Sequence, residues 1–176
     1  GNATFTGAIN GIPFFTDTAR NSMYTHDVSG TATSADGNTA YGFGALDAIT
    51  GGDLNTVVGY LAGSAINSGS NNVLMGYASG DALTTGSDNV AIGYAALSVE
   101  NTGNRNVAIG KGALNALDFD GNGYNTAVGY NAGLAVTTGV QNILIGGLAG
   151  DALTTGGANV AIGYGALGLE DTGGRN

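Results

Sequence analysis

An asparagine followed four positions later by a glycine recurs along this chain at an almost constant interval. Successive asparagines define a 17-residue repeat, and the single exception is a two-residue insertion between Asn106 and Asn125. A unit this short cannot bury an apolar face alone, so successive units must stack on one another. The sequence therefore predicts a solenoid of eight coils over residues 38–176. The repeated residues are Asn38, Asn55, Asn72, Asn89, Asn106, Asn125, Asn142 and Asn159, paired with Gly42, Gly59, Gly76, Gly93, Gly110, Gly129, Gly146 and Gly163.

The letters of one copy indicate strands and turns. Each copy opens with Asn, two or three small or β-branched apolar residues and the Gly, which is typical of a short strand, and closes with a Gly-rich turn such as "TTG". We expect an all-β fold, a parallel β-roll or β-solenoid of 17-residue coils, about 40 Å long at the usual strand spacing. Asparagines in register can bond their amides up and down such a stack. The Gly marks a bend or a close approach of another backbone. The segment after it, such as "YAALSVE", fits either a helical turn or a second strand.

Four coils form a larger unit. Residues 72–105 and 142–175 are identical at 22 of 34 positions, which indicates duplication of a four-coil block. The position eight places after each asparagine follows the same rhythm: Leu46, Gly63, Gly80, Leu97, Leu114, Gly133, Gly150 and Leu167.

Both faces of the predicted strand are apolar. Val90 and Ile92 lie on one face, and Ala91 lies on the other, as Leu74 does one coil earlier. A strand that is apolar on both sides is typically buried on both sides. We therefore expect lateral association of copies, most simply as an intertwined or side-by-side homotrimer.

Residues 1–37 lack the repeat. The stretches "NATFTGAI" and "GIPFF" predict short strands, and "THDVSGTATSADGN" a polar connector. We place a boundary near Gly37, between an amino-terminal β-rich shaft or connector segment (1–37) and the eight-coil repeat domain (38–176).

The spellings "NVAIG" and "NTAVG" followed by Tyr-x-Ala resemble the head repeats of trimeric autotransporter adhesins. Those repeats are shorter and build a left-handed parallel β-roll in which three chains pack together. The 17-residue spelling "NTAVGYNAGLAVTTGVQ" is more similar to repeats of bacteriophage tail fibres, and "GNATFTGAINGIPFF" is similar to phage fibre shafts. The resemblance covers residues 38–176 well and 1–37 loosely. It implies a stacked trimeric fibre with a structural or adhesive role.

Composition disfavours several other functions. The net charge is −9, and only Arg20, Arg105, Lys111 and Arg175 could contact phosphates, so we expect no nucleic-acid partner. The sequence has no apolar run long enough to span a bilayer, so we expect no membrane insertion. There is no cysteine, and the lone histidine, His26, lies among Ser22, Ser29 and Ser34 of a polar segment. We expect no enzymatic activity and no cofactor.

The two-residue insertion contains the one motif with ligand chemistry. Asp118, Asp120 and Asn122, followed by Gly123, follow the order Asp-x-Asp-x-Asn-Gly of the front half of a calcium loop. The bidentate Glu expected at the twelfth position is replaced by Gly129. The alternatives are a weak calcium site and a plain bulge in the rod, and the missing ligand favours the bulge.

Three further patterns have a structural interpretation beside a functional one. An aromatic column could stack on sugars or on itself, and its regular spacing favours self-stacking. A threonine column could match an ice lattice, but its second rank is mixed in composition. Glu100 with Arg105, and Glu170 with Arg175, recur at positions where they could pair. The aromatic column is Phe43, Tyr60, Tyr77, Tyr94, Tyr130 and Tyr164, and the threonine column is Ser68, Thr85, Thr102, Thr138, Thr155 and Thr172.

Together these patterns predict a rod segment of a trimeric phage tail fibre, on the virion surface, that mediates attachment to a host receptor such as a glycan. The alternatives are a bacterial adhesin head on a cell surface and a self-assembling extracellular filament. A carbohydrate- or ice-binding solenoid fits the sequence less well.

Overall fold

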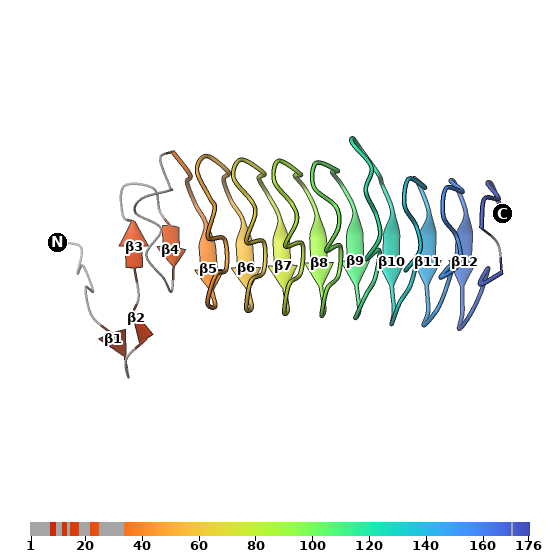
Figure 1. Ribbon diagram of the computed structural model, residues 1–176, viewed down its shortest axis with the longest axis horizontal. Helices are drawn as coiled ribbons and strands as arrows, with labels where there is room; N and C mark the ends of the chain where they lie inside the picture. Colours follow the sequence, from red (N-terminus) through yellow and green to blue (C-terminus); the bar gives the residue numbers. More distant parts are fainter. Residues whose placement is uncertain (1–7, 10–11, 14, 18–21, 25–33, 170) are drawn as a thin grey trace.

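The computed structural model of the chain describes residues 8–9, 12–13, 15–17, 22–24, 34–169 and 171–176, and these residues contain strands and turns but no helix. Consequently no helix among them could cross a membrane. Eight strands of three residues each follow one another along the rod, and each strand lies across the long axis of the rod (Figure 1). They are β5 (Thr39–Tyr41), β6 (Thr56–Val58), β7 (Val73–Met75), β8 (Val90–Ile92), β9 (Val107–Ile109), β10 (Thr126–Val128), β11 (Ile143–Ile145) and β12 (Val160–Ile162).

Each of these strands pairs in parallel with the strand of the next coil. The register is one full repeat, so Ala91 of β8 pairs with Leu74 of β7 and with Ala108 of β9. The register is kept across the longer coil, where Ala127 pairs with Ala108. Eight strands are thus joined by seven complete turns, and the predicted parallel β-solenoid with 17-residue coils is confirmed.

The sheet continues toward the amino terminus. β4 (Ser22–Tyr24) pairs in parallel with β5, and β3 (Phe15–Asp17) pairs antiparallel with β4. A separate antiparallel pair is formed by β1 (Ala8–Ile9) and β2 (Ile12–Pro13), within the stretches where strands were expected. Ser34 already donates its backbone N–H to the first coil, at the carbonyl of Thr50.

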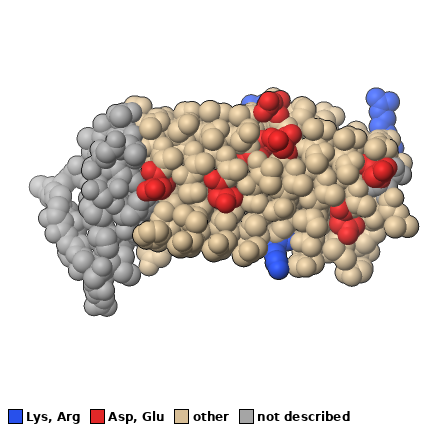
Figure 2. Space-filling model, viewed as in Figure 1, with Lys and Arg blue, Asp and Glu red and all other residues tan. Residues whose placement is uncertain are grey.

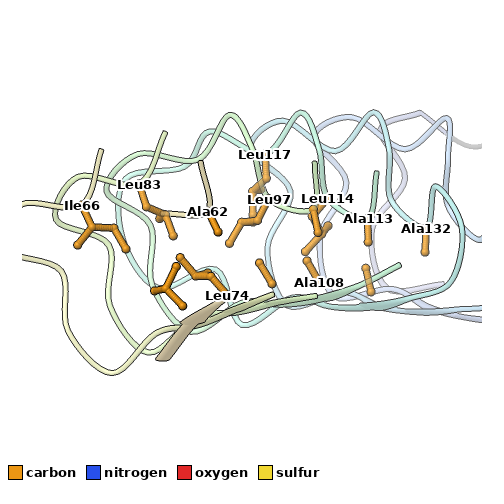
Figure 3. Packing of buried hydrophobic residues seen from close by; sticks show 14 of the residues in the cluster. Ala62, Ile66, Leu74, Leu83, Leu97, Ala108, Ala113, Leu114, Leu117 and Ala132 are labelled. Carbon is orange, nitrogen blue, oxygen red and sulfur yellow. The ribbon is translucent and has the colours of Figure 1, made fainter. Parts of the chain in front are cut away.

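The core lies between the strands and the turn segment opposite them. The middle residue of each strand from β5 to β12 points inward and is buried, whereas its two neighbours point outward. Leu74 and Ala108, from the strand side, lie opposite Leu97 and Leu114 from the turn side (Figure 3). The strands and the turn segment each contribute one layer of side chains to the core. The space between them is narrow, and alanine and leucine dominate it.

The asparagine ladder has the predicted bonding. In a typical coil, the side-chain oxygen of Asn55 accepts the backbone N–H of Asn72 at 3.0 Å and its side-chain N–H at 3.0 Å. The side-chain nitrogen of Asn72 also donates to the carbonyl of Gly86, which closes the same coil, at 2.9 Å. All eight asparagines are buried. From Asn55 to Asn159 each backbone N–H donates to the amide oxygen of the preceding asparagine, so the ladder links successive coils.

The position after each strand requires glycine for two reasons: its φ is positive, and the backbone of the next coil lies too close for a side chain. Gly76 has φ 131°, and a Cβ placed on it would lie 2.6 Å from the carbonyl oxygen of Gly93 in the next coil. Both expectations for this column, a bend and a close backbone approach, are confirmed. The segment directly after it forms turns, because two of its positions take positive φ in every coil, for example Ala95 (φ 50°) and Leu97 (φ 55°). The segment is therefore neither a helix nor a second strand.

Candidate functional site: the outer face of the sheet

The outward side chains of β5–β12 form one continuous surface. None of them is charged, and from β7 onward they are mostly Val, Ile and Met. In coils with a neighbour on both sides, Met75 (41%), Ile143 (40%) and Ile145 (38%) are exposed in the single chain, and Val90, Ile92, Val107 and Ile109 are half-buried. We call this surface the outer face. It consists of Thr39, Tyr41, Thr56, Val58, Val73, Met75, Val90, Ile92, Val107, Ile109, Thr126, Val128, Ile143, Ile145, Val160 and Ile162.

An aromatic column begins directly after the glycine bend that ends each strand. The rings of Phe43, Tyr60, Tyr77 and Tyr94 stack on one another, with centroids 5.8, 5.5 and 5.1 Å apart and interplanar angles of 15° or less. Lys111 takes the next place, and its amine lies 5.5 Å from the Tyr94 ring centroid and 5.8 Å from that of Tyr130. Stacking within the column occupies ring faces that a sugar would need, which supports the structural interpretation of this column.

Charged groups are sparse and separated on the view of the rod in Figure 2. Arg105 makes an ion pair with Asp88 at 3.5 Å and donates a hydrogen bond to the hydroxyl of Tyr124 at 3.0 Å. Such exposed pairs add about 0–1 kcal/mol. This view of the rod therefore presents a largely uncharged surface with separate, mostly acidic groups.

Hydroxyl groups in one of the two threonine ranks make hydrogen bonds between coils. Thr84 donates its hydroxyl to the carbonyl of Asn101 at 3.1 Å, and Thr154 donates to that of Asp171 at 2.7 Å. The adjacent rank, which includes Thr85 and Thr138, is exposed. With one rank engaged in coil-to-coil bonds, the two-rank hydroxyl surface that ice binding would need is incomplete.

The two extra residues form a loop at one corner of the coil that starts at Asn106. Asp118 and Asn122 are exposed, Asp120 accepts a hydrogen bond from the Thr102 hydroxyl, and Asn122 pairs with Asn104 in a parallel bridge. Asn106 lacks the glycine carbonyl that the other asparagine amides bind and donates to the carbonyl of Asn104 at 3.2 Å instead. The described residues contain no group of three or more Asp, Glu, His or Cys side chains that could hold a metal ion. Calcium at Asp118, Asp120 and Asn122 stays a prediction.

Glu100 has a structural role that differs from the ion pair expected from the sequence. In the preceding coil the backbone N–H groups of Thr84, Thr85 and Gly86 all donate to the carbonyl of Asn101. In the coil of Glu100 the Gly103 N–H donates instead to the Glu100 carboxylate at 2.7 Å, and the Thr102 N–H does so at 3.2 Å.

The same carboxylate also binds the insertion loop, because it accepts the Phe119 N–H at 3.2 Å. Glu100 occupies a core position that is Leu83 one coil earlier and Leu117 one coil later, and it is fully buried. This burial raises the pKa of the Glu100 carboxyl, and the backbone hydrogen bonds oppose the shift. The Glu100 side chain thus replaces the carbonyl that a regular next coil would supply.

The expected pairing of Glu100 with Arg105 is therefore wrong. Glu100 points into the core, whereas Arg105 is exposed and pairs with Asp88. Glu170 lies outside the described residues, so its pairing with Arg175 stays a prediction. A glutamate at a position that is apolar in neighbouring coils, next to the only insertion, was the signal that could have revealed this role.

The residues considered for catalysis lie mostly outside the described side chains, so the expectation of no enzymatic activity stays a prediction. His26 and Ser29 lie outside the described residues, Ser22 lies in β4, and Ser34 precedes the first coil. Comparison of the chain with protein-family models, with curated proteins and with solved structures gives no match in any of the three.

Proposed function

We propose that this chain is a structural rod segment of a fibre on a virion or cell surface, in which copies of the chain pack together through the outer face. The preferred assembly is a homotrimer. Its role is to hold an attachment site for a host-surface receptor away from the particle. In this proposal the outer face is an interface between copies, and no chemical reaction is involved.

The observation that carries the proposal is the apolar outer face of a single chain. Exposed apolar surfaces of this extent are uncommon on monomeric proteins and mark interaction sites. A face that repeats every coil suits a partner with the same repeat, because equivalent side chains then meet along the whole rod. A second copy of the chain has that repeat, whereas a small ligand would use only a few coils.

The resemblance to tail-fibre and adhesin repeats favours three chains, and between them the 17-residue spelling favours the phage fibre. A bacterial adhesin head would use the same kind of interface, in which copies pack through their outer faces. An extracellular filament would add end-to-end growth of the rods, which would make the particle size depend on concentration.

A paired substitution tests the interface. We expect Ile109→Lys, in the middle of the outer face, to shift the particle toward single chains, because a buried unpaired charge is strongly unfavourable at an interface. Thr138→Lys, on the exposed threonine rank, is the matched control and should leave the particle mass unchanged. Sedimentation velocity measures both. Equal masses for the Ile109→Lys variant and the control would contradict the assigned interface.

A further inference from the structure

The aromatic column contains tyrosines whose rings are held in contact. Tyr60 and Tyr77 stack with centroids 5.5 Å apart, and Tyr77 and Tyr94 stack with centroids 5.1 Å apart. The exposed fractions of these three residues are 48%, 49% and 54%, so a small oxidant in solvent can reach each residue although the rings are stacked. In the unfolded chain a whole repeat separates each tyrosine from the next, so their contact is a property of the stacked coils.

We propose that Tyr60, Tyr77 and Tyr94 form a site of oxidative cross-linking, in which a one-electron oxidant of the peroxidase–hydrogen peroxide class joins adjacent rings as dityrosine. Each of two phenols loses one electron and one proton to give a phenoxyl radical. The radicals form a carbon–carbon bond between their ortho carbons, and the two ortho hydrogens move to the phenolic oxygens as the rings regain aromaticity. One hydrogen peroxide accepts the two electrons and two protons and yields two waters.

Such a bond would join successive coils within one chain. No disulfide can join the coils, because the chain has no cysteine. Successive coils are held by hydrogen bonds, core packing, ring stacking and the Arg105–Asp88 ion pair. A covalent bond between Tyr60 and Tyr77 or between Tyr77 and Tyr94 would close a loop of one coil and restrict the unfolded chain, as a disulfide does. The contacts lie within one chain, so this inference does not depend on self-association.

The column also contains its own controls. Tyr130 faces the Lys111 amine, and Gly147 occupies the column place between Tyr130 and Tyr164. No stacked pair of rings among the described residues includes Tyr130 or Tyr164. These two tyrosines should therefore contribute little to cross-linking within the chain.

The test treats the full chain with a heme peroxidase and hydrogen peroxide at low protein concentration. Dityrosine fluorescence, the intact mass and peptide mapping are then measured. We expect the loss of two hydrogens per link, no increase in mass on a denaturing gel, and cross-linked peptides that contain Tyr77. Tyr77→Phe should abolish these peptides, whereas Tyr130→Phe should leave them unchanged.

A gain of cross-linking provides a second readout that does not depend on losing a signal. Lys111→Tyr would place a ring between Tyr94 and Tyr130 and should add cross-linked peptides that contain Tyr130. Equal dityrosine yield from Tyr77→Phe and the wild-type chain would overturn the proposal. Products that link only separate chains, seen as dimers on the denaturing gel, would also overturn it.

Discussion

Leu74, in the middle of β7, fills the space that a side chain at Gly80 would occupy. A Cβ placed on Gly80 would lie 3.0 Å from Cδ2 of Leu74, and one placed on Gly63 of the preceding coil would lie 2.8 Å from its Cδ1. Leu144 has the same relationship to Gly150 and Gly133. In the coil after Leu74 the sizes are reversed, with Ala91 on the strand and Leu97 on the turn side, both buried. The four-coil pattern of leucine and glycine therefore follows a volume rule: where the strand contributes a large side chain to the core, the turn side contributes none.

This volume rule predicts a compensating pair of substitutions. Leu74→Ala alone should lower the free energy of unfolding by about 2–5 kcal/mol because it leaves a cavity. Gly80→Leu alone should cost about 1–3 kcal/mol through overpacking. The double variant should lose less than the sum, by about 1–3 kcal/mol, because it reproduces the Ala91–Leu97 arrangement. Denaturant unfolding of the four chains measures this coupling, and strict additivity would contradict the rule.

The glycine bend predicts a large difference between two substitutions of the same kind. Gly76→Ala should destabilise the rod by about 3–5 kcal/mol, because a methyl group at φ 131° would collide with the Gly93 carbonyl. Gly147→Ala should change stability by less than about 0.5 kcal/mol, because its Cβ would lie 3.4 Å from the Tyr164 ring, an ordinary contact. Thermal unfolding of both variants would show whether the bend column has this role.

The asparagine ladder predicts that one amide supports two coils. Asn89→Ala would leave the buried N–H of Asn106 and the carbonyl of Gly103 without their partners, which lie at 2.9 and 2.8 Å. We expect a loss of about 2–6 kcal/mol, from about 1–3 kcal/mol for each of the two unsatisfied groups. Asn122→Ala, on the exposed insertion loop, is the control. Similar stabilities for the two variants would mean that the ladder contributes little.

Glu100 predicts a pH dependence of stability. Burial raises the pKa of its carboxyl above the ordinary value of 4.5. The folded chain then keeps this proton at pH values where the unfolded chain has released it, so the free energy of unfolding falls as pH rises above about 4.5. The pKa of Asp81 is raised by burial too, so its contribution has the same sign.

Comparison with Glu100→Gln isolates the contribution of Glu100. Relative to this variant, the wild-type chain should lose stability between pH 4.5 and neutral pH, as measured by denaturant unfolding at several pH values. Asp118→Asn, at an exposed position, controls for the loss of one negative charge. Parallel pH profiles for wild type and Glu100→Gln would exclude the effect.

The repeat length and the strands could be predicted from the sequence because the asparagine and the glycine are locally constrained at every coil. Asn89 must bond up and down the stack, and Gly93 must adopt φ 136°, so neither can vary freely. The turn segment could not be predicted, since Leu97 takes a positive φ that leucine rarely adopts. Its buried side chain and the hydrogen bond from its N–H to the Ala113 carbonyl both depend on neighbouring coils. The role of Glu100 depends on which backbone groups the insertion leaves unpaired, and this relationship between two coils is not visible in either one alone.

The native mass of the particle in solution tests the central claim most directly. Light scattering or mass photometry at several dilutions should give three times the 17.2 kDa of the chain, because three copies can then cover their outer faces against one another. A stable single chain at all dilutions would contradict the account, since the outer face would then remain in water.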